Sequence, residues 1–443
     1  MRRLALSMTL GGLAAAVIGF SKLHAVAHDY DYTNTPRFAY SFAYIGVHWV
    51  SAYGMGFPDL RRSRREAYPG AVQATLLAAL GMSILQLVTG DALLPRFVVF
   101  GSAVVSMPWL VLCARLNALG TSRAEDRDRI LVVASHADRD ALESELELEP
   151  ERGAVLVGAL DPARAGTTAA GGGAPLEELA RACRASVIVL GRDAQLDESV
   201  VGQAALLHEA GVRIRTLSLF YEEWLGKLPV SELERISLMF DIGEVHRNRY
   251  LRVKRLLDVA LSLPGLVALA AVMPLVVIGN VLGNRGPLFY HQVRVGKQGE
   301  PFAILKFRSM TDAPVPAEGG GCWTLADDPR VTRFGRILRT THLDEMPQVI
   351  NILRGELSVV GPRPEQPHYV DELVEKLPFY ALRHLVRPGL TGWAQVKYHY
   401  ASDEHDAMEK LQYEFFYLRH QSIALDLRII GRTVRSVLGR GGR

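Results

Sequence analysis

Two adjacent carboxylates, Asp344 and Glu345, are the residues of this chain best suited to chemistry. Arg339 precedes them by five positions, and Arg363 follows in a Gly-Pro-Arg-Pro run, so cations flank the pair on both sides. Neighbouring residues at the start of a helix diverge by about 100° of rotation, so one carboxylate can attack a substrate while the other binds a metal ion. A guanidinium suits phosphate because its fork donates two parallel hydrogen bonds. The cluster therefore indicates chemistry at a phosphate group.

Five short motifs surround these residues. They are Lys306-Phe-Arg-Ser-Met310, Leu343-Asp-Glu-Met-Pro-Gln348, Asn351-Ile-Leu-Arg-Gly355, Gly361-Pro-Arg-Pro-Glu365 and Arg387-Pro-Gly-Leu-Thr-Gly-Trp-Ala-Gln395. Their order resembles the catalytic domain of the bacterial sugar transferases, the monotopic phosphoglycosyl transferases, which move a sugar phosphate from a nucleotide sugar onto a polyprenyl phosphate. The resemblance extends from about Arg249 to the C-terminus.

The resemblance implies a role for each of the charged residues. Asp344 matches the family's nucleophile, which forms a phosphosugar-aspartate, and Glu345 matches the residue that helps to hold Mg²⁺. Covalent catalysis of this kind divides one transfer into two displacements, and Mg²⁺ takes hard oxygen ligands and neutralises diphosphate charge. Gln348 and Asn351 are candidates for donors behind the site, or for capping and packing roles. The phosphate-binding candidates are Arg339 and Arg363, then Arg387, and then Lys306 and Arg308, which either touch the substrate or only organise the site.

The segment after the last motif bears on the sugar. It reads Lys397-Tyr-His-Tyr400, where small family members that handle acetamido sugars often have Asn-Gly-Arg. This departure favours a plain hexose such as glucose or galactose. The implied reaction is UDP-hexose + undecaprenyl phosphate → polyprenyl-diphospho-hexose + UMP, which initiates an exopolysaccharide, capsule or O-antigen. The intact carboxylates and arginines argue against a membrane scaffold with a degenerate transferase domain, and release of UDP would instead indicate an ordinary glycosyltransferase.

Composition indicates a membrane protein. Hydrophobic residues make up 49% of the 443 residues, and the mean hydropathy is positive, which is high for a soluble protein. The formal net charge of +3 is too small to indicate nucleic-acid binding. Basic clusters beside apolar runs are instead typical of a membrane surface. The three cysteines form no metal-binding or redox pattern, which fits a reducing compartment.

Four apolar segments precede residue 120, and each approaches the ~20 residues that a helix needs to cross ~30 Å of hydrocarbon. Arginines lie before the first segment, in the Arg61–Arg65 loop after the second, and from Arg115 onward after the fourth. The positive-inside rule places these parts in the cytoplasm and predicts a multi-pass protein of the bacterial inner membrane. A cleaved signal peptide is the competing interpretation of the first segment, but it would leave three spans and break the charge alternation. The segments are Leu4–Phe20, Phe38–Phe57, Ala71–Gly90 and Leu93–Leu116.

Residues 127–220 alternate short apolar strands with helices, which predicts a parallel sheet of βαβ units, a Rossmann-like module. The turn after the first strand, Ala134-Ser-His-Ala-Asp-Arg139, lacks the glycines through which such a fold approaches a pyrophosphate. This argues against a nucleotide-dependent oxidoreductase. It favours a structural, regulatory or dimer-forming module, so a homodimer is one expected assembly. The predicted strands are Arg129–Ala134, Val155–Ala159, Ala185–Leu190 and Val212–Leu217.

The basic run Arg247–Arg255 leads into the almost wholly apolar stretch Leu256–Leu282. This stretch is either a fifth spanning helix or, as in the family it resembles, a re-entrant helix that enters the inner leaflet and turns back. Pro264 and Pro274 favour a kink, and a full crossing would separate the catalytic motifs from cytoplasmic nucleotide sugars. Ser262 and Pro264 resemble the family's helix break, and the Ser262 hydroxyl is expected to satisfy a backbone carbonyl freed by the proline.

Together these features predict three parts. They are a membrane α-helical bundle of four spans at 1–120, a Rossmann-like α/β module at 125–220 and, after a linker at 221–248, an α-rich phosphoglycosyl transferase catalytic domain with a re-entrant helix at 249–443. The second and third parts are expected on the cytoplasmic face. The expected partners are a UDP-hexose, undecaprenyl phosphate and the lipid bilayer, with Mg²⁺ as cofactor and no nucleic acid.

Overall fold

The computed structural model describes residues 2–57, 67–89, 92–122, 128–147, 151, 153–166, 174–229, 247–284, 286–311, 330–377, 379–398 and 404–438. The basic loop at 58–66, most of the predicted linker and His399 with Tyr400 lie outside these ranges. The chain divides into two compact units, one made of Met1–Gly120 with Gly243–Arg443 and the other of Thr121–Ile242.

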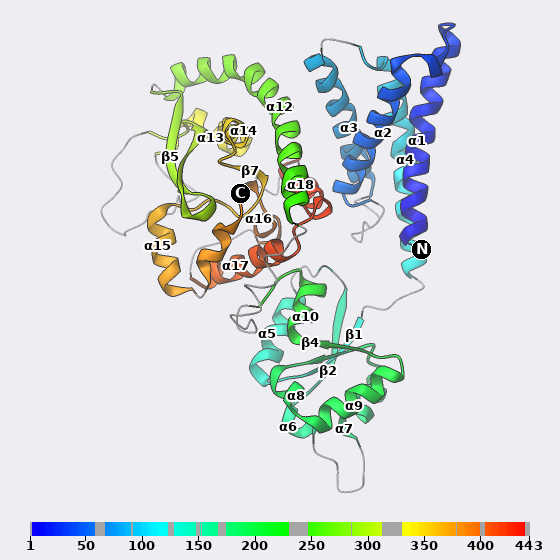
Figure 1. The fold of residues 1–443 in the computed structure, drawn as a ribbon, viewed down its shortest axis with the longest axis vertical. Helices are drawn as coiled ribbons and strands as arrows, with labels where there is room; N and C mark the ends of the chain where they lie inside the picture. Colours follow the sequence, from blue (N-terminus) through cyan, green and yellow to red (C-terminus); the bar gives the residue numbers. More distant parts are fainter. Residues whose placement is uncertain are drawn as a thin grey trace. The chain divides into compact units, whose positions relative to one another are not determined.

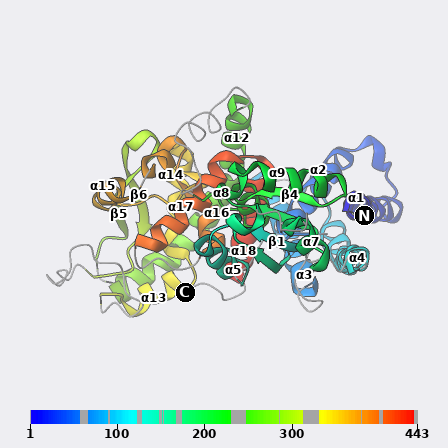
Figure 2. The same ribbon diagram turned by 90° about the horizontal axis from the view of Figure 1, so that it is seen from below.

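Four helices form the N-terminal part of the first unit, one for each predicted apolar segment (Figure 1). Figures 1 and 2 show α1 and α4 side by side, and a glycine permits this close approach. A Cβ atom on Gly12 would lie 1.8 Å from Nε1 of Trp109, which donates a hydrogen bond of 3.0 Å to the Met8 carbonyl. The helices are α1 (Arg2–Ala27), α2 (Pro36–Gly54), α3 (Ala67–Thr89) and α4 (Arg96–Ser122), with a 3₁₀ turn η1 (Tyr32–Asn34) before α2.

Three helices within the described part of the chain are long and apolar enough to cross a membrane. They cover Leu4–Ala27, Arg96–Asn117 and Tyr250–Asn284. Large apolar side chains such as Phe97 and Phe100 stay exposed on the outside of the helices, where lipid can cover them. The chain is therefore a membrane protein. Since α2 and α3 are not among the three helices, the number of four spans stays a prediction, as does the orientation.

The helix α12 (Arg247–Gly279) continues into a π-helical turn, η4 (Asn280–Asn284). It contains Pro264 and Pro274, and Figure 1 shows that it bends along its course. Prolines explain such a bend because each one removes a backbone hydrogen bond and crowds the preceding turn. The expected role of Ser262 is wrong: its hydroxyl is buried and has no hydrogen-bond partner among the residues that the structure describes.

The second unit contains a four-stranded parallel sheet in the order β2-β1-β3-β4, which confirms the predicted alternation of strands and helices. Helices cover both faces, since Leu131 packs with α7 and α9 whereas its neighbour Ile130 packs with α5 and α10. The strands are β1 (Asp128–Val133), β2 (Ala154–Leu160), β3 (Val187–Leu190) and β4 (Arg213–Thr216). The helices are α5 (His136–Glu147), α6 (Pro162–Ala165), α7 (Pro175–Ala182), α8 (Arg192–Leu196), α9 (Glu198–Glu209), α10 (Leu217–Phe220) and the π turn η2 (Tyr221–Leu225).

The rest of the first unit combines short strands with helices around α12. An antiparallel hairpin of β5 (Phe289–Val295) and β6 (Pro301–Phe307) turns at η5 (Lys297–Gly299), and β7 (Ser358–Val360) pairs in parallel with β8 (Gly389–Thr391). A small core of Leu269, Val276, Phe307, Leu338 and Val349 joins α12 to β6, α13 and α14. The remaining elements are α13 (Arg333–Thr340), η6 (Leu343–Glu345), α14 (Gln348–Arg354), α15 (Pro367–Lys376), η7 (Tyr380–Leu385), α16 (Trp393–Lys397), α17 (Glu404–Arg419) and α18 (Ile423–Leu438).

Candidate active site

The carboxylate pair lies in the single 3₁₀ turn η6 between α13 and α14. His342 precedes it in the left-handed region, at φ 55°, and turns the chain from one helix into the next. A 3₁₀ helix has three residues per turn, so successive side chains are rotated by about 120°. Asp344 and Glu345 therefore project in different directions, as the sequence predicted, and they have different surroundings.

Glu345 is held by a cation that comes from another element. Lys306 on β6 places Nζ 2.7 Å from Oε1 of Glu345, and Nη2 of Arg363 lies 4.0 Å from the same oxygen. Burial by itself raises the pKa of Glu345, but Lys306 and Arg363 outweigh burial and lower the pKa to about 2. Glu345 is consequently ionised at any physiological pH.

Asp344 has the opposite environment. Its side chain makes no hydrogen bond and no ion pair with any residue in the described ranges. Burial and the neighbouring charge of Glu345 raise the pKa of Asp344 above its ordinary value, although Lys306, Arg339 and His342 act in the other direction. Asp344 is thus a carboxylate without a fixed partner, with three basic side chains nearby, which is what a nucleophile directed at a phosphate requires.

The loop that carries Arg363 is built from backbone contacts that only glycine permits. A Cβ atom on Gly361 would lie 2.4 Å from the carbonyl oxygen of Arg387, and one on Gly389 would lie 2.1 Å from the nitrogen of Gly361. Gly389 N donates to the Pro362 carbonyl at 2.8 Å and locks the start of β8 against the loop. Arg363 itself is half-exposed, so its guanidinium can reach a ligand.

A buried ion pair supports this loop from behind. Arg383 on η7 contacts both carboxylate oxygens of Glu414 on α17, at 2.8 Å through Nε and 2.7 Å through Nη2. Nη2 of Arg383 also donates to the carbonyl oxygen of Arg363 at 2.9 Å. Side-chain exposures of 4% and 6% show that the pair is removed from water. Glu414 therefore lies on the face of α17 that is turned toward the protein interior.

Lys306 is held in place by the hairpin and by α14. Asn351, which is fully buried, accepts a hydrogen bond from Leu305 N at 3.0 Å and donates to the Ala303 carbonyl at 2.8 Å. These bonds fasten β6 to the helix that follows the carboxylates. Of the alternatives left open for Asn351, the structure favours support of the strand that presents Lys306.

Two predicted phosphate-binding residues lie elsewhere. Arg308 directs Nε toward the Met310 carbonyl at 3.2 Å and contacts Gly286, which fits an organising role. Arg387 lines a separate cavity with Arg252, Lys254 and Arg255. The structure thus gathers Lys306, Arg339 and Arg363 about the carboxylates and places Arg387 apart from them.

Three further basic residues near the pair lie outside the predicted set of site residues. His342 acts electrostatically on both carboxylates, and Arg294 on β5 donates from Nη1 to the Pro364 carbonyl at 3.1 Å. Lys410 lies close enough to Arg363 and Glu365 for their charges to affect it, and burial lowers its pKa. His342 is adjacent to a recognised motif and could have been found there. Arg294 carries no local signal, because only folding brings β5 to the loop, and Lys410 shows only a helical spacing with its neighbours.

The carboxylates also fit a magnesium ion that binds together with a diphosphate. No three His, Cys, Asp or Glu side chains cluster as a metal site within the described residues. Mg²⁺ is usually held by one or two carboxylates plus substrate phosphates and water, and Glu345 supplies one such carboxylate beside Asp344. Lys306 engages only Oε1 of Glu345.

Comparison with known proteins identifies related sequences over the catalytic part. The family model described as "Bacterial sugar transferase" matches residues 249–440. The UDP-N-acetylgalactosamine-undecaprenyl-phosphate N-acetylgalactosaminephosphotransferase of Aeromonas hydrophila is 37% identical over 236 residues, which cover 49% of this chain and 55% of that protein. The UDP-glucose:undecaprenyl-phosphate glucose-1-phosphate transferase of Xanthomonas campestris pv. campestris is 38% identical over 223 residues, or 49% of this chain and 44% of that protein.

A shorter relative is matched over most of its length. It is the uncharacterized sugar transferase EpsL of Bacillus subtilis (strain 168), 38% identical over 186 residues, which cover 42% of this chain and 87% of that protein. The chain spans about half the length of the two longer relatives. The similarity therefore includes every residue of the carboxylate cluster described above and most of the fold around it.

Proposed function

The chain belongs to the bacterial sugar transferase family, and we propose that it transfers a hexose 1-phosphate from a UDP-hexose to undecaprenyl phosphate. The products are polyprenyl-diphospho-hexose and UMP. The observation that carries the proposal is the difference in surroundings between the two adjacent carboxylates, Asp344 and Glu345. Glu345 is neutralised by Lys306, whereas Asp344 has no partner in the described part of the chain and has basic side chains around it.

In the first displacement, a carboxylate oxygen of Asp344 attacks the β-phosphorus of the UDP-hexose. The bond from this phosphorus to the bridging oxygen breaks, and UMP leaves with the oxygen. The hexose phosphate is then esterified to Asp344. Arg339, Lys306 and Arg363 supply positive charge where the phosphate oxygens gain negative charge, and preorganised charges of this kind lower the barrier.

In the second displacement, an oxygen of undecaprenyl phosphate attacks the same phosphorus. The bond to Asp344 breaks, the carboxylate is restored, and the hexose phosphate is now joined to the lipid phosphate. Two displacements at one phosphorus need a nucleophile that also leaves well, and a carboxylate meets both requirements. The buried pair of Arg383 and Glu414 keeps the loop of Arg363 in position during both steps.

Glu345 would hold Mg²⁺ against the diphosphate, where the ion would neutralise charge on the substrate and on UMP, while Asp344 stays free to attack. Glu345 suits this role because Lys306 and Arg363 keep it ionised. Lys306 in turn ties Glu345 to β6 and limits the directions in which the carboxylate can point.

The acceptor requires a site that reaches the membrane. We assign α12 as a re-entrant helix whose bend lies in the inner leaflet, which leaves the carboxylates on the cytoplasmic side, where UDP-sugars occur. Support comes from the bend of α12 and its two internal prolines. With this orientation the enzyme is a protein of the bacterial inner membrane, and the reaction begins an exopolysaccharide, capsule or O-antigen.

The sugar is proposed to be glucose or galactose. The names of the relatives include both N-acetylgalactosamine and glucose, so similarity alone does not select one. Lys397 and Tyr398 stand where acetamido-specific members often have another motif, and Lys397 places Nζ 5.8 Å from the centre of the Trp393 ring. A cation held there takes part in packing, and the proposal of a plain hexose rests on the departure from that motif.

Nucleotide release tests the proposal. Full-length protein in detergent would be incubated with undecaprenyl phosphate, Mg²⁺ and, in turn, UDP-glucose, UDP-galactose or UDP-N-acetylgalactosamine, beside the Asp344→Asn variant. UMP release that requires the lipid and is lost in the variant would support the mechanism. Release of UDP would refute it, and the absence of release with every UDP-sugar would favour a scaffold.

A further inference from the structure

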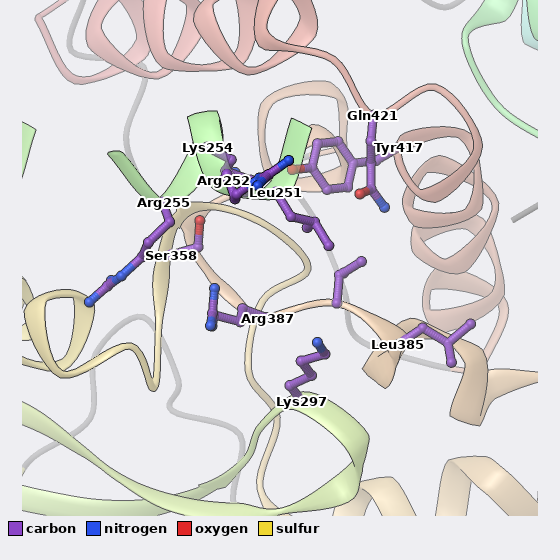
Figure 3. Close-up of a pocket in the computed structure, with 11 residues that line it drawn as sticks. Leu251, Arg252, Lys254, Arg255, Lys297, Ser358, Leu385, Arg387, Tyr417 and Gln421 are labelled. Carbon is purple, nitrogen blue, oxygen red and sulfur yellow. The ribbon is translucent and has the colours of Figure 1, made fainter. Parts of the chain in front are cut away.

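A second cationic site lies beside the start of α12. A cavity of about 440 Å³ opens between the first turns of α12, the turn after β5 and the segment that leads into β8, and Figure 3 shows its lining side chains. Its volume is within the range of small-molecule sites, roughly 300–1,000 Å³. None of Asp344, Glu345, Lys306 and Arg363 lines it. We call it the α12 cavity, and its basic lining residues are Arg252, Lys254, Arg255, Lys297 and Arg387.

The charges of the α12 cavity are only partly compensated. Lys254 pairs with Asp426 at 3.0 Å, and Arg255 donates to the carbonyls of Ile352 and Leu353. Lys297 and Arg387 make no hydrogen bond and no ion pair through their side chains with any described residue. No carboxylate is among the lining residues. A cavity with this excess of positive charge selects an anion, and guanidinium groups suit a phosphate in particular.

The place of the cavity in the fold favours a phosphate carried by a lipid. Arg252, Lys254 and Arg255 lie at the start of Tyr250–Asn284, a candidate membrane span. Charged side chains are costly within hydrocarbon, so this end of α12 must lie at the depth of the headgroups. Leu251, Leu385 and Val386 add an apolar wall, and Leu385 is 43% exposed. A ligand with a charged head and an apolar tail matches both the basic lining residues and this apolar wall.

We propose that the α12 cavity binds the phosphate group of a membrane lipid. Arg387 and Lys297 contact the phosphate, and Arg252 on α12 adds charge from the other side (Figure 3). The lipid is either an acidic phospholipid that anchors α12 or a polyprenyl phosphate on its way to the carboxylates. The second source rests on the proposed function, whereas the first does not.

One helix joins the cavity to the carboxylates. Arg255 binds the last carbonyls of α14, and α14 begins just after the turn that carries Asp344. Its seven residues span roughly 10 Å. The cavity is thus a separate site, yet it is near enough for a lipid phosphate to move from one site to the other along α14.

Direct measurement of lipid binding tests the inference without requiring activity. Native mass spectrometry would be applied to the full-length protein in detergent with dioleoyl phosphatidylglycerol, undecaprenyl phosphate, dioleoyl phosphatidylcholine or UMP. The variant Lys297→Gln/Arg387→Gln removes the two unpaired cations. The matched control Arg181→Gln/Lys376→Gln removes two exposed cations, each paired with a glutamate four residues earlier on its own helix.

The inference predicts that the double variant loses affinity for at least one lipid phosphate by about tenfold or more, because a hydrogen bond to a charged group contributes at least that factor. The control keeps wild-type affinity, and phosphatidylcholine binding is unchanged. A loss of affinity for undecaprenyl phosphate alone would identify the ligand as the polyprenyl acceptor. A loss of affinity for phosphatidylglycerol alone would identify it as an anchoring phospholipid.

Unchanged affinity for both acidic lipids would refute the inference, and so would a loss confined to UMP. UMP release is measured on the same preparations, so that a loss of transferase activity can be told apart from a loss of lipid binding in the cavity. If the double variant does not fold, Lys297→Gln alone decides the matter, since Lys297 is exposed and its replacement leaves the packing intact. The Lys297→Gln substitution must then lower the affinity for an acidic lipid about threefold or more.

Discussion

Nη2 of Arg383 donates a hydrogen bond of 2.9 Å to the carbonyl oxygen of Arg363. Arg383 is itself buried and paired with Glu414, so the loop that presents Arg363 depends on an ion pair that the substrate does not touch. Removing one member of a buried pair leaves an uncompensated charge, which costs about 3–5 kcal/mol.

We expect Arg383→Lys to weaken catalysis more than stability. Lysine keeps the charge but lacks the fork that reaches Glu414 and the Arg363 carbonyl together. The KM for the UDP-sugar should rise about tenfold while the melting temperature falls by only a few degrees. Glu414→Gln, which leaves Arg383 unpaired, should instead lower the melting temperature strongly. Equal effects of both variants on KM and stability would argue against a positioning role.

Asp344→Asn should lower UMP release by about 1,000-fold or more, as expected when a covalent nucleophile is removed. Without lipid, the wild-type protein incubated with UDP-hexose should gain the mass of one hexose phosphate, on the peptide that contains Asp344. The variant should gain none. Mass spectrometry of the intact protein and its peptides makes the comparison, and an adduct on another residue would identify a different nucleophile.

Lys306→Met should shift the pH dependence of activity. In the folded protein the pKa of Glu345 is about 2, below its ordinary value of 4.5, so the ionised carboxylate adds stability above pH 4.5 that is lost as the pH falls toward 2. Without Lys306, burial dominates and raises the pKa of Glu345. The acid limb of UMP release should therefore move to higher pH, whereas Lys306→Arg should leave it nearly in place. An unmoved acid limb in Lys306→Met would show that Glu345 does not govern it.

Gly389→Ala should destabilise the protein by more than about 2 kcal/mol, because a Cβ atom there would lie 2.1 Å from the nitrogen of Gly361. A matched control is Gly202→Ala within α9, where no atom lies within 4 Å of the added carbon. Alanine in a helix should stabilise the protein there by roughly 0.5–1 kcal/mol. Thermal unfolding measures the stability of both variants. Similar melting temperatures would mean that the loop moves to accommodate the added carbon at residue 389.

Chelation of divalent cations should abolish UMP release, and Mg²⁺ should restore it. Mg²⁺ fits one or two carboxylates with substrate phosphates, whereas Ca²⁺ prefers more protein oxygens at longer distances. Ca²⁺ should therefore restore less activity than Mg²⁺ at equal concentration. Full activity in excess chelator would exclude the proposed part of Glu345 in metal binding.

Several elements could be predicted from the sequence because local patterns determine them. The strand from Arg129 and the buried strand that ends at Leu190 were recognised from apolar runs between helical segments, and alternation implied parallel pairing. Asp344, Glu345, Arg339 and Arg363 were recognised because their motifs are contiguous. The expected hydrogen bond of Ser262 was wrong, because a buried hydroxyl follows the rotation of its helix and the neighbours that packing supplies.

The sequence by itself determined which chemical groups are present and which short segments carry them. Only the tertiary structure decided which charges meet. Lys306 lies 39 residues from Glu345, and Arg383 lies 31 residues from Glu414, yet both pairs are in contact. Arg387 precedes by two residues Gly389, the glycine that locks the loop of Arg363, yet its side chain lines the α12 cavity. The physical reason is that backbone patterns depend on neighbours a few residues away, whereas Coulomb interactions depend on distances that exist only after β6, α14 and α17 have packed.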